Sequence, residues 1–103
     1  MKTKEELTEL LEKSGYPSAF LFFESEQIPP YSILVMDSSA NIHSDTEMVQ
    51  PVDTFTIEFY YRNPKDRFEF EKFLTDHLIW QRYSTDVPIG QNGVLMSSYE
   101  PVY

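Results

Sequence analysis

The residues whose types could carry out chemistry are acidic side chains and two histidines, and their spacing does not form a catalytic set. Glu58 falls within a predicted strand and Asp37 ends another, so a carboxylate pair for hydrolysis would need the fold to bring them together. His43 opens the run HSDTE, which contains metal-ligand types, but a single loop is a poor metal scaffold. His77 lies on an apolar helical stripe, as a hydrogen-bonded histidine at a core edge does. We therefore expect no enzyme, and no catalytic, cofactor or metal site.

The motifs of several site classes are missing from the sequence. The chain has no cysteine, which excludes disulfides and thiolate metal sites. It has three glycines, too few for a glycine-rich phosphate loop, and no G-x-S-x-G elbow around its serines. Its longest apolar runs, AFLFF and ILVM, are far shorter than the roughly 20 residues that a membrane span needs. We expect no membrane association.

The charge of the chain is negative and unevenly distributed. The net charge is −9, which argues against direct binding to nucleic-acid phosphates. From Ser14 to Tyr61 there is no lysine or arginine. Such an anionic stretch can simply keep the protein soluble. Alternatively, it can form a functional surface that repels nucleic-acid phosphates. The carboxylates of this stretch are Glu24, Glu26, Asp37, Asp45, Glu47, Asp53 and Glu58.

The elements that must position these residues begin with a helix predicted over residues 4–14. Thr3 and Glu6 have the spacing of a capping box, in which each side chain satisfies an amide at the helix start. Leu7 and the leucines one turn later form a narrow apolar stripe. Gly15 is suited to the left-handed residue just past the helix end, and Pro17 prevents continuation. The sequence therefore predicts a short helix that is apolar on one side.

Alternation and turn residues predict the strands. The clearest is 52–61, where Phe55, Ile57, Phe59 and Tyr61 point one way and Thr54, Thr56, Glu58 and Tyr60 point the other. Strands are also predicted at 19–24, 31–37 and 94–103, with 79–83 either a short strand or a helix extension and 84–93 a turn-rich segment. The polar residues 38–50 predict a mobile loop.

A second helix is predicted over 66–78, directly after the strand at 52–61. Asp66 is the expected N-cap, with Glu69 three residues later, and Phe70 and Leu74 lie on the apolar face. Together these elements predict a single α+β domain over residues 1–103. Its sheet would have four to five mainly antiparallel strands, with both helices packed on one face. The other face would then be left to solvent or to a neighbouring protein.

Four stretches of the chain are similar in order and length to one protein family. They are SGYPSAF, FFESEQIPPYSILVM, TFTIEFYYRNPKDRFEFEKFL and the final SSYEPVY. With the PPY before the second strand and the strand-corner-helix run IEFYYRNPKD, the chain resembles the small head–tail joining proteins of long-tailed phages and prophages. These are often called tail completion or tail terminator proteins. The chain departs from the family pattern at Phe59 and Tyr61, where Leu and Thr are common, and at Met48-Val49, where an aromatic often follows the loop aspartate.

This resemblance implies a structural virion protein that forms a ring, typically hexameric, between the tail tube and the head connector. It implies assembly in the host cytoplasm, a final place at the tail–head junction, and DNA that passes through the channel without sequence-specific binding. The cation-free stretch would line that channel. The alternative is an acidic protein that mimics DNA and inhibits a host nucleic-acid enzyme. The residues predicted to form the interface are Tyr31, Asp45, Glu47, Met48, Glu58 and Tyr60.

Overall fold

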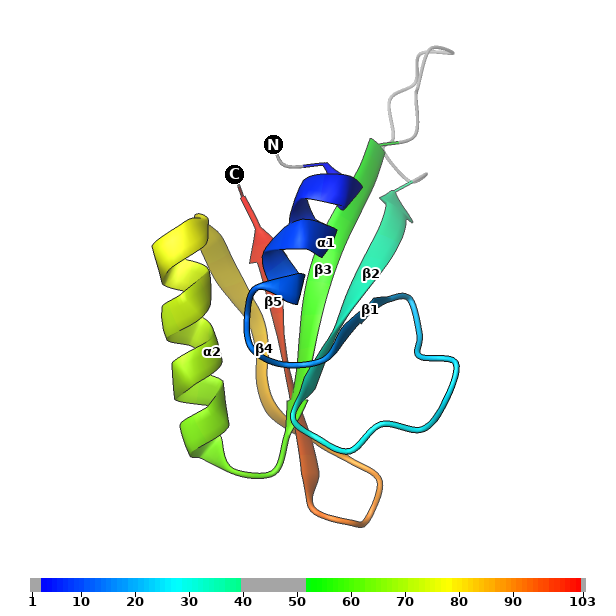
Figure 1. Ribbon diagram of the computed structural model, residues 1–103, viewed down its shortest axis with the longest axis vertical. Coiled ribbons are helices and arrows are strands. Elements are labelled where there is room, and N and C mark those ends of the chain that lie inside the picture. The colour runs from blue at the N-terminus through cyan, green and yellow to red at the C-terminus, as the bar shows by residue number, and fades with distance from the viewer. Residues whose placement is uncertain (1–2, 40–51, 103) are drawn as a thin grey trace.

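The computed structural model describes residues 3–39 and 52–102 (Figure 1). Its elements are α1 (Lys4–Glu12), β1 (Ser18–Phe20), β2 (Tyr31–Ser39), β3 (Val52–Tyr61), α2 (Pro64–His77), β4 (Trp80–Ile89) and β5 (Val94–Pro101). The strands form one sheet in the order β1-β2-β3-β5-β4, in which only the short β1–β2 pair is parallel. The predicted α+β class with a mainly antiparallel sheet is therefore confirmed.

Helix α1 begins at the predicted capping box. The Glu6 amide donates to Thr3 Oγ1 at 3.2 Å, and the Thr3 amide donates to Glu6 Oε1 at 2.9 Å. The helix ends at Glu12, two residues earlier than predicted, with Lys13 as C-cap. Gly15 then has φ +91°, a conformation that favours glycine, so it does supply the left-handed turn after the helix.

The core lies between both helices and a single face of the sheet. Leu7 and Leu11 of α1 belong to this core, as do Phe70 and Leu74 of α2. Both pairs pack against strand side chains that alternate along the chain and so lie on the same face of the sheet. These strand side chains are Leu34, Ile57, Phe59, Tyr61 and Tyr99. The Phe59 and Phe70 rings stack with centroids 4.1 Å apart. In Figure 1, α1 lies in front of the sheet and α2 lies at its left, and no helix of the described part of the chain is drawn behind the sheet.

The corner between β3 and α2 differs from its prediction. The N-cap is Asn63, whose Oδ1 accepts from the Lys65 amide at 3.0 Å, and Pro64 occupies the start of the helix. Asp66 is inside the first turn, so its assignment as cap was wrong. Proline fits this position because its missing N–H needs no partner there. The helix also ends one residue earlier than predicted, at His77.

Four strands also differ from their predicted bounds. Strand β5 ends at Pro101, before the predicted end at residue 103. Strand β1 stops at Phe20 because Leu21 adopts a left-handed conformation with φ +72°, so residues 21–24 were wrongly predicted as strand. Strand β2 runs to Ser39, which removes two residues from the predicted loop 38–50; the rest of that loop lies outside the described residues. Strand β4 continues to Ile89 through the segment predicted as turn-rich, with register shifts at two places. A proline and register irregularities are tolerated there because β4 is an edge strand.

Candidate interaction surface

The face of the sheet opposite the helices, here called the open face, carries a cluster of aromatic rings. Tyr31 on β2 and Tyr60 on β3 are directly opposite each other in the ladder, and their rings stack with centroids 5.0 Å apart. The Phe23 ring packs edge-on against Tyr31 at 5.4 Å. Burial raises the pKa of the Tyr31 phenol, so this tyrosine is neutral at physiological pH. The cluster is therefore a rigid, mostly apolar platform with hydroxyl groups at its rim.

A groove of about 1070 Å³ extends from this platform. One wall is the segment between β1 and β2, and the other is the turn between β4 and β5. Phe22 is 66% exposed and Ile28 is 79% exposed on the first wall, which is unusual for such large apolar side chains. Exposed apolar and aromatic side chains that share one groove are a feature of surfaces that bind another protein. The groove is lined by Phe22, Phe23, Ser25, Glu26, Gln27, Ile28, Pro29, Tyr31, Ile33, Tyr60, Arg62, Ile89, Gly90, Gln91, Asn92 and Val94.

A second hollow of about 270 Å³ lies on the same face and contains Glu58. The Tyr60 hydroxyl donates to Glu58 Oε1 at 2.9 Å. Burial first, and this bond to a carboxylate second, raise the pKa of Tyr60, so the donor stays protonated. Glu100 lines the same hollow, and its Oε2 accepts from Gln81. Every charged side chain in the described lining of this hollow is thus a carboxylate.

The six residues predicted to form the interface divide into two groups. Tyr31, Glu58 and Tyr60 come together on the open face through the stacked rings and the Tyr60–Glu58 hydrogen bond. Asp45, Glu47 and Met48 lie outside the described residues. The exposed residues of the groove's first wall were missed, because residues 19–24 were interpreted as strand. The two adjacent phenylalanines followed by acidic residues were the signal that was available.

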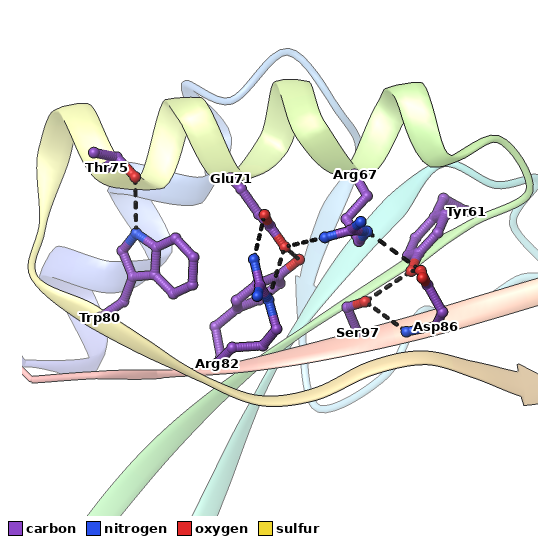
Figure 2. Close-up of polar contacts among 9 residues, drawn as sticks. Tyr61, Arg67, Glu71, Thr75, Trp80, Arg82, Asp86 and Ser97 are labelled. Carbon is purple, nitrogen blue, oxygen red and sulfur yellow. Dashed lines mark hydrogen bonds and ion pairs between the residues drawn. The ribbon is translucent and has the colours of Figure 1, made fainter.

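A second set of polar side chains lies beneath α2, between the helix and strands β3, β4 and β5 (Figure 2). Glu71 accepts from Arg67 Nη1 at 3.0 Å, from Arg82 Nη2 at 2.7 Å and from the Tyr99 hydroxyl at 2.8 Å. The side chains of Arg67 and Glu71 are each only 12% exposed. Burial alone would raise the pKa of Glu71, but these hydrogen bonds outweigh it and hold the pKa below its ordinary value. Glu71 is therefore ionised at neutral pH.

The other end of this polar set holds strand β4. Asp86, in a left-handed conformation with φ +52°, accepts from the Tyr61 hydroxyl, and its own amide donates to Ser97 Oγ at 3.0 Å. Arg67 Nε lies 3.3 Å from Asp86 Oδ1 as an ion pair, not as an aligned hydrogen bond. The Ser97 and Tyr61 hydroxyls are 2.7 Å apart. The i, i+4 spacing of Arg67 and Glu71 was the only part of this arrangement visible in the sequence.

The chemistry of this polar set is structural. Burial raises the pKa of both Tyr61 and Tyr99, and the neighbouring carboxylates raise it further, so both hydroxyls remain protonated. The carboxylate of Glu71 accepts hydrogen bonds from three residues, Arg67, Arg82 and Tyr99, which occupy both of its oxygens. These contacts attach α2 to the irregular strand β4, and they leave the open face as the candidate functional surface.

Metal and membrane sites do not arise from the described residues. Residues 3–39 and 52–102 contain no group of three or more histidine, cysteine or acidic side chains that could hold a metal ion. His77 is exposed, but Nδ1 lies 2.9 Å from the Phe73 carbonyl oxygen and the centroid of the imidazole ring lies 4.4 Å from that of the Phe73 ring, which packs against the core. The predicted hydrogen bond of this histidine is therefore present. His43 lies outside the described residues. No helix in the described chain is long and apolar enough to cross a membrane.

No model of a protein family matches the chain, and no curated protein matches its sequence at a significant level.

Proposed function

We propose that this protein is a head–tail joining component of a long-tailed phage or prophage, of the tail completion or terminator type, that assembles into a ring at the tail–head junction. The observation that carries the proposal is the open face. A small domain whose helices both cover one side of its sheet leaves an aromatic groove on the other side. Apolar surface of this kind is normally covered by a partner.

The sheet edges support the same proposal. Strands β1 and β4 are the outer strands of the sheet and have no further strand partner among the described residues. Edge strands offer backbone amides and carbonyls to a neighbour. In a closed ring each copy would cover an edge or a face of the next, so no subunit would leave such surface exposed.

The charge of the open face fits a channel that DNA passes through. Glu58 and Glu100 are the charged residues of the second hollow. Carboxylates facing the channel would repel phosphates and would release no counterions, so DNA would slide without being held. We propose that the second hollow faces the channel, and that the groove beside it contacts protein.

Native mass spectrometry with the tail-tube and head-connector proteins of the same genome tests the proposal. We expect a ring, alone or on either partner. Ile28→Ser should weaken assembly because it removes an exposed groove residue, whereas Ile79→Ser is the control, since Ile79 is 62% exposed but does not line the groove. A chain that associates with neither itself nor a virion protein would contradict the proposal. Salt-sensitive binding to a basic host nuclease would instead support the DNA-mimic alternative.

A further inference from the structure

Two of the places where large apolar side chains are exposed lie on different flanks of the molecule. The first is in the groove, where Phe22 and Ile28 are largely exposed. The second is on α2, where Phe68 is 59% exposed. In Figure 1 the segment between β1 and β2, which forms the groove wall, lies to the right of the sheet, and α2 lies to the left. A single copy therefore cannot bring the two groups together.

The first wall of the groove and the side of α2 around Phe68 carry opposite charge. Glu26 lines this wall and Glu24 is exposed on the same segment, which contains no lysine or arginine. Arg62 also lines the groove, but it directly follows β3 and is not part of this wall. On α2, Lys65 and Lys72 are exposed and stand three residues before and four residues after Phe68, which places all three on one side of the helix. We call Lys65, Phe68 and Lys72 the α2 knob.

The α2 knob is held firmly in place by the polar set beneath the helix. The Arg67 guanidinium lies 4.6 Å from the centroid of the Phe68 ring. Arg67 is itself fixed by Glu71 and Asp86. The Phe68 ring is thus exposed on a rigid element beside cationic groups, which reduces the entropy that is lost when a partner binds it.

We propose that the α2 knob of one copy docks into the groove of a second copy of this chain. The Phe68 ring would pack against the exposed apolar wall of the groove, and Lys65 and Lys72 would face Glu24 and Glu26. Because the two surfaces differ and lie on opposite flanks, the contact is heterologous and repeats from copy to copy, which generates a ring when the rotation closes. This inference rests on the proposed ring and names the contact that builds it.

Charge selects this pairing over the two symmetric ones. Packing the first walls of two copies against each other would bring their Glu24 and Glu26 side chains together, and knob against knob would bring lysines together. Both arrangements place like charges opposite each other, whereas the knob against the first wall pairs lysines with carboxylates.

The absence of cysteine permits a direct test by disulfide trapping. Ile28→Cys and Phe68→Cys replace exposed side chains, so both variants should fold. Cysteine is itself a small apolar residue and, unlike the serine of Ile28→Ser, keeps part of the apolar contact, while the flanking lysines and glutamates stay unchanged. Equal amounts are mixed and oxidised, and the disulfide-linked dimers are counted by mass spectrometry. We expect the 28–68 dimer to exceed both homodimers and the control dimer between Ile28→Cys and Ile79→Cys several-fold. A 28–68 dimer at the statistical level would overturn the proposal.

A charge exchange provides the second measurement. The Phe68→Cys chain is made with Lys65→Glu and Lys72→Glu together, and the Ile28→Cys chain with Glu24→Lys and Glu26→Lys together. Either charge-reversed chain, mixed with the unreversed partner chain, should give a lower yield of the 28–68 dimer. Mixing the two reversed chains should restore the yield, and failure to restore it would count against the contact.

If the virion proteins bind but the 28–68 dimer is not enriched, the contact is wrong and the proposed function stands. If the dimer is enriched but native mass spectrometry shows neither a ring nor a complex with a virion protein, the contact stands and the proposed function is wrong.

Discussion

Glu71 is the residue on which the contacts beneath α2 converge. Its carboxylate neutralises Arg67, a nearly buried cation, and accepts from Arg82 and Tyr99. Glu71→Gln keeps the size of the side chain but leaves the Arg67 charge poorly compensated. We expect it to lower the free energy of unfolding by about 2–3 kcal/mol, measured by urea denaturation. An unchanged midpoint would mean that solvent compensates Arg67.

The pH dependence of that loss provides the control. The folded pKa of Glu71 is lowered, so its contribution is fully present above the ordinary carboxyl pKa of about 4.3. It is lost as the pH falls through the lower folded value. The stability gap between wild type and Glu71→Gln should therefore be constant near neutral pH and close in acid. Glu12→Gln, at an exposed position of α1, should change stability by less than about 0.5 kcal/mol at either pH.

At the scale of elements, the start of α2 offers two candidate N-cap residues. Both Asn63 and Asp66 are residues that favour an N-cap, and only the structure shows that the Asn63 side chain accepts from the Lys65 amide. We expect Asn63→Ala to cost about 1 kcal/mol of unfolding free energy. Asp66→Ala should cost less, about 0.5 kcal/mol, because it removes only a charge near the helix N-terminus. Equilibrium denaturation of both variants makes the comparison, and the opposite order would restore Asp66 as the cap.

An element could be predicted where the residues that determine it are its own neighbours in sequence, and not where they are distant in sequence. Strand β3 was predicted at both bounds, because its alternation follows directly from burial of Ile57, Phe59 and Tyr61 on one side. Strand β4 was largely missed, because Asp86 and Pro88 favour a turn locally. Pro88 is tolerated because β4 is an edge strand. Asp86 is held in the strand by its contacts with Tyr61, Arg67 and Ser97. Those partners are distant in sequence, so no local pattern reveals them.

The part of the candidate surface that follows from local strand alternation could be predicted, and the part that depends on an unusual backbone conformation could not. Tyr31, Glu58 and Tyr60 were identified because the β3 alternation assigns Glu58 and Tyr60 to the face away from the core. The groove depends on Leu21, whose left-handed conformation ends β1 and starts the wall that bears Phe22 and Ile28. Leucine rarely adopts that conformation, so the sequence carried no signal for it.

At the scale of the whole molecule, folding and assembly use different parts of the chain. Among the described residues, the core extends along β2 only as far as Leu34, whereas the β2–β3 ladder continues to the pair Ser39 and Val52. The predicted contacts of Asp45, Glu47 and Met48 lie in the segment that joins this pair. The end of the β2–β3 hairpin should therefore serve partners more than it serves the core.

Replacing residues 40–51 by Asn-Gly tests this division. A two-residue turn can close a hairpin at a paired position such as Ser39 and Val52, and Asn-Gly favours the required turn. Because a shorter loop loses less entropy on closure, unfolding free energy should stay level or rise by about 1 kcal/mol. The 28–68 dimer should still form, but binding of the tail-tube protein in native mass spectrometry should fall. Loss of the fold would mean that residues 40–51 belong to the core, and undiminished binding would remove Asp45, Glu47 and Met48 from the interface.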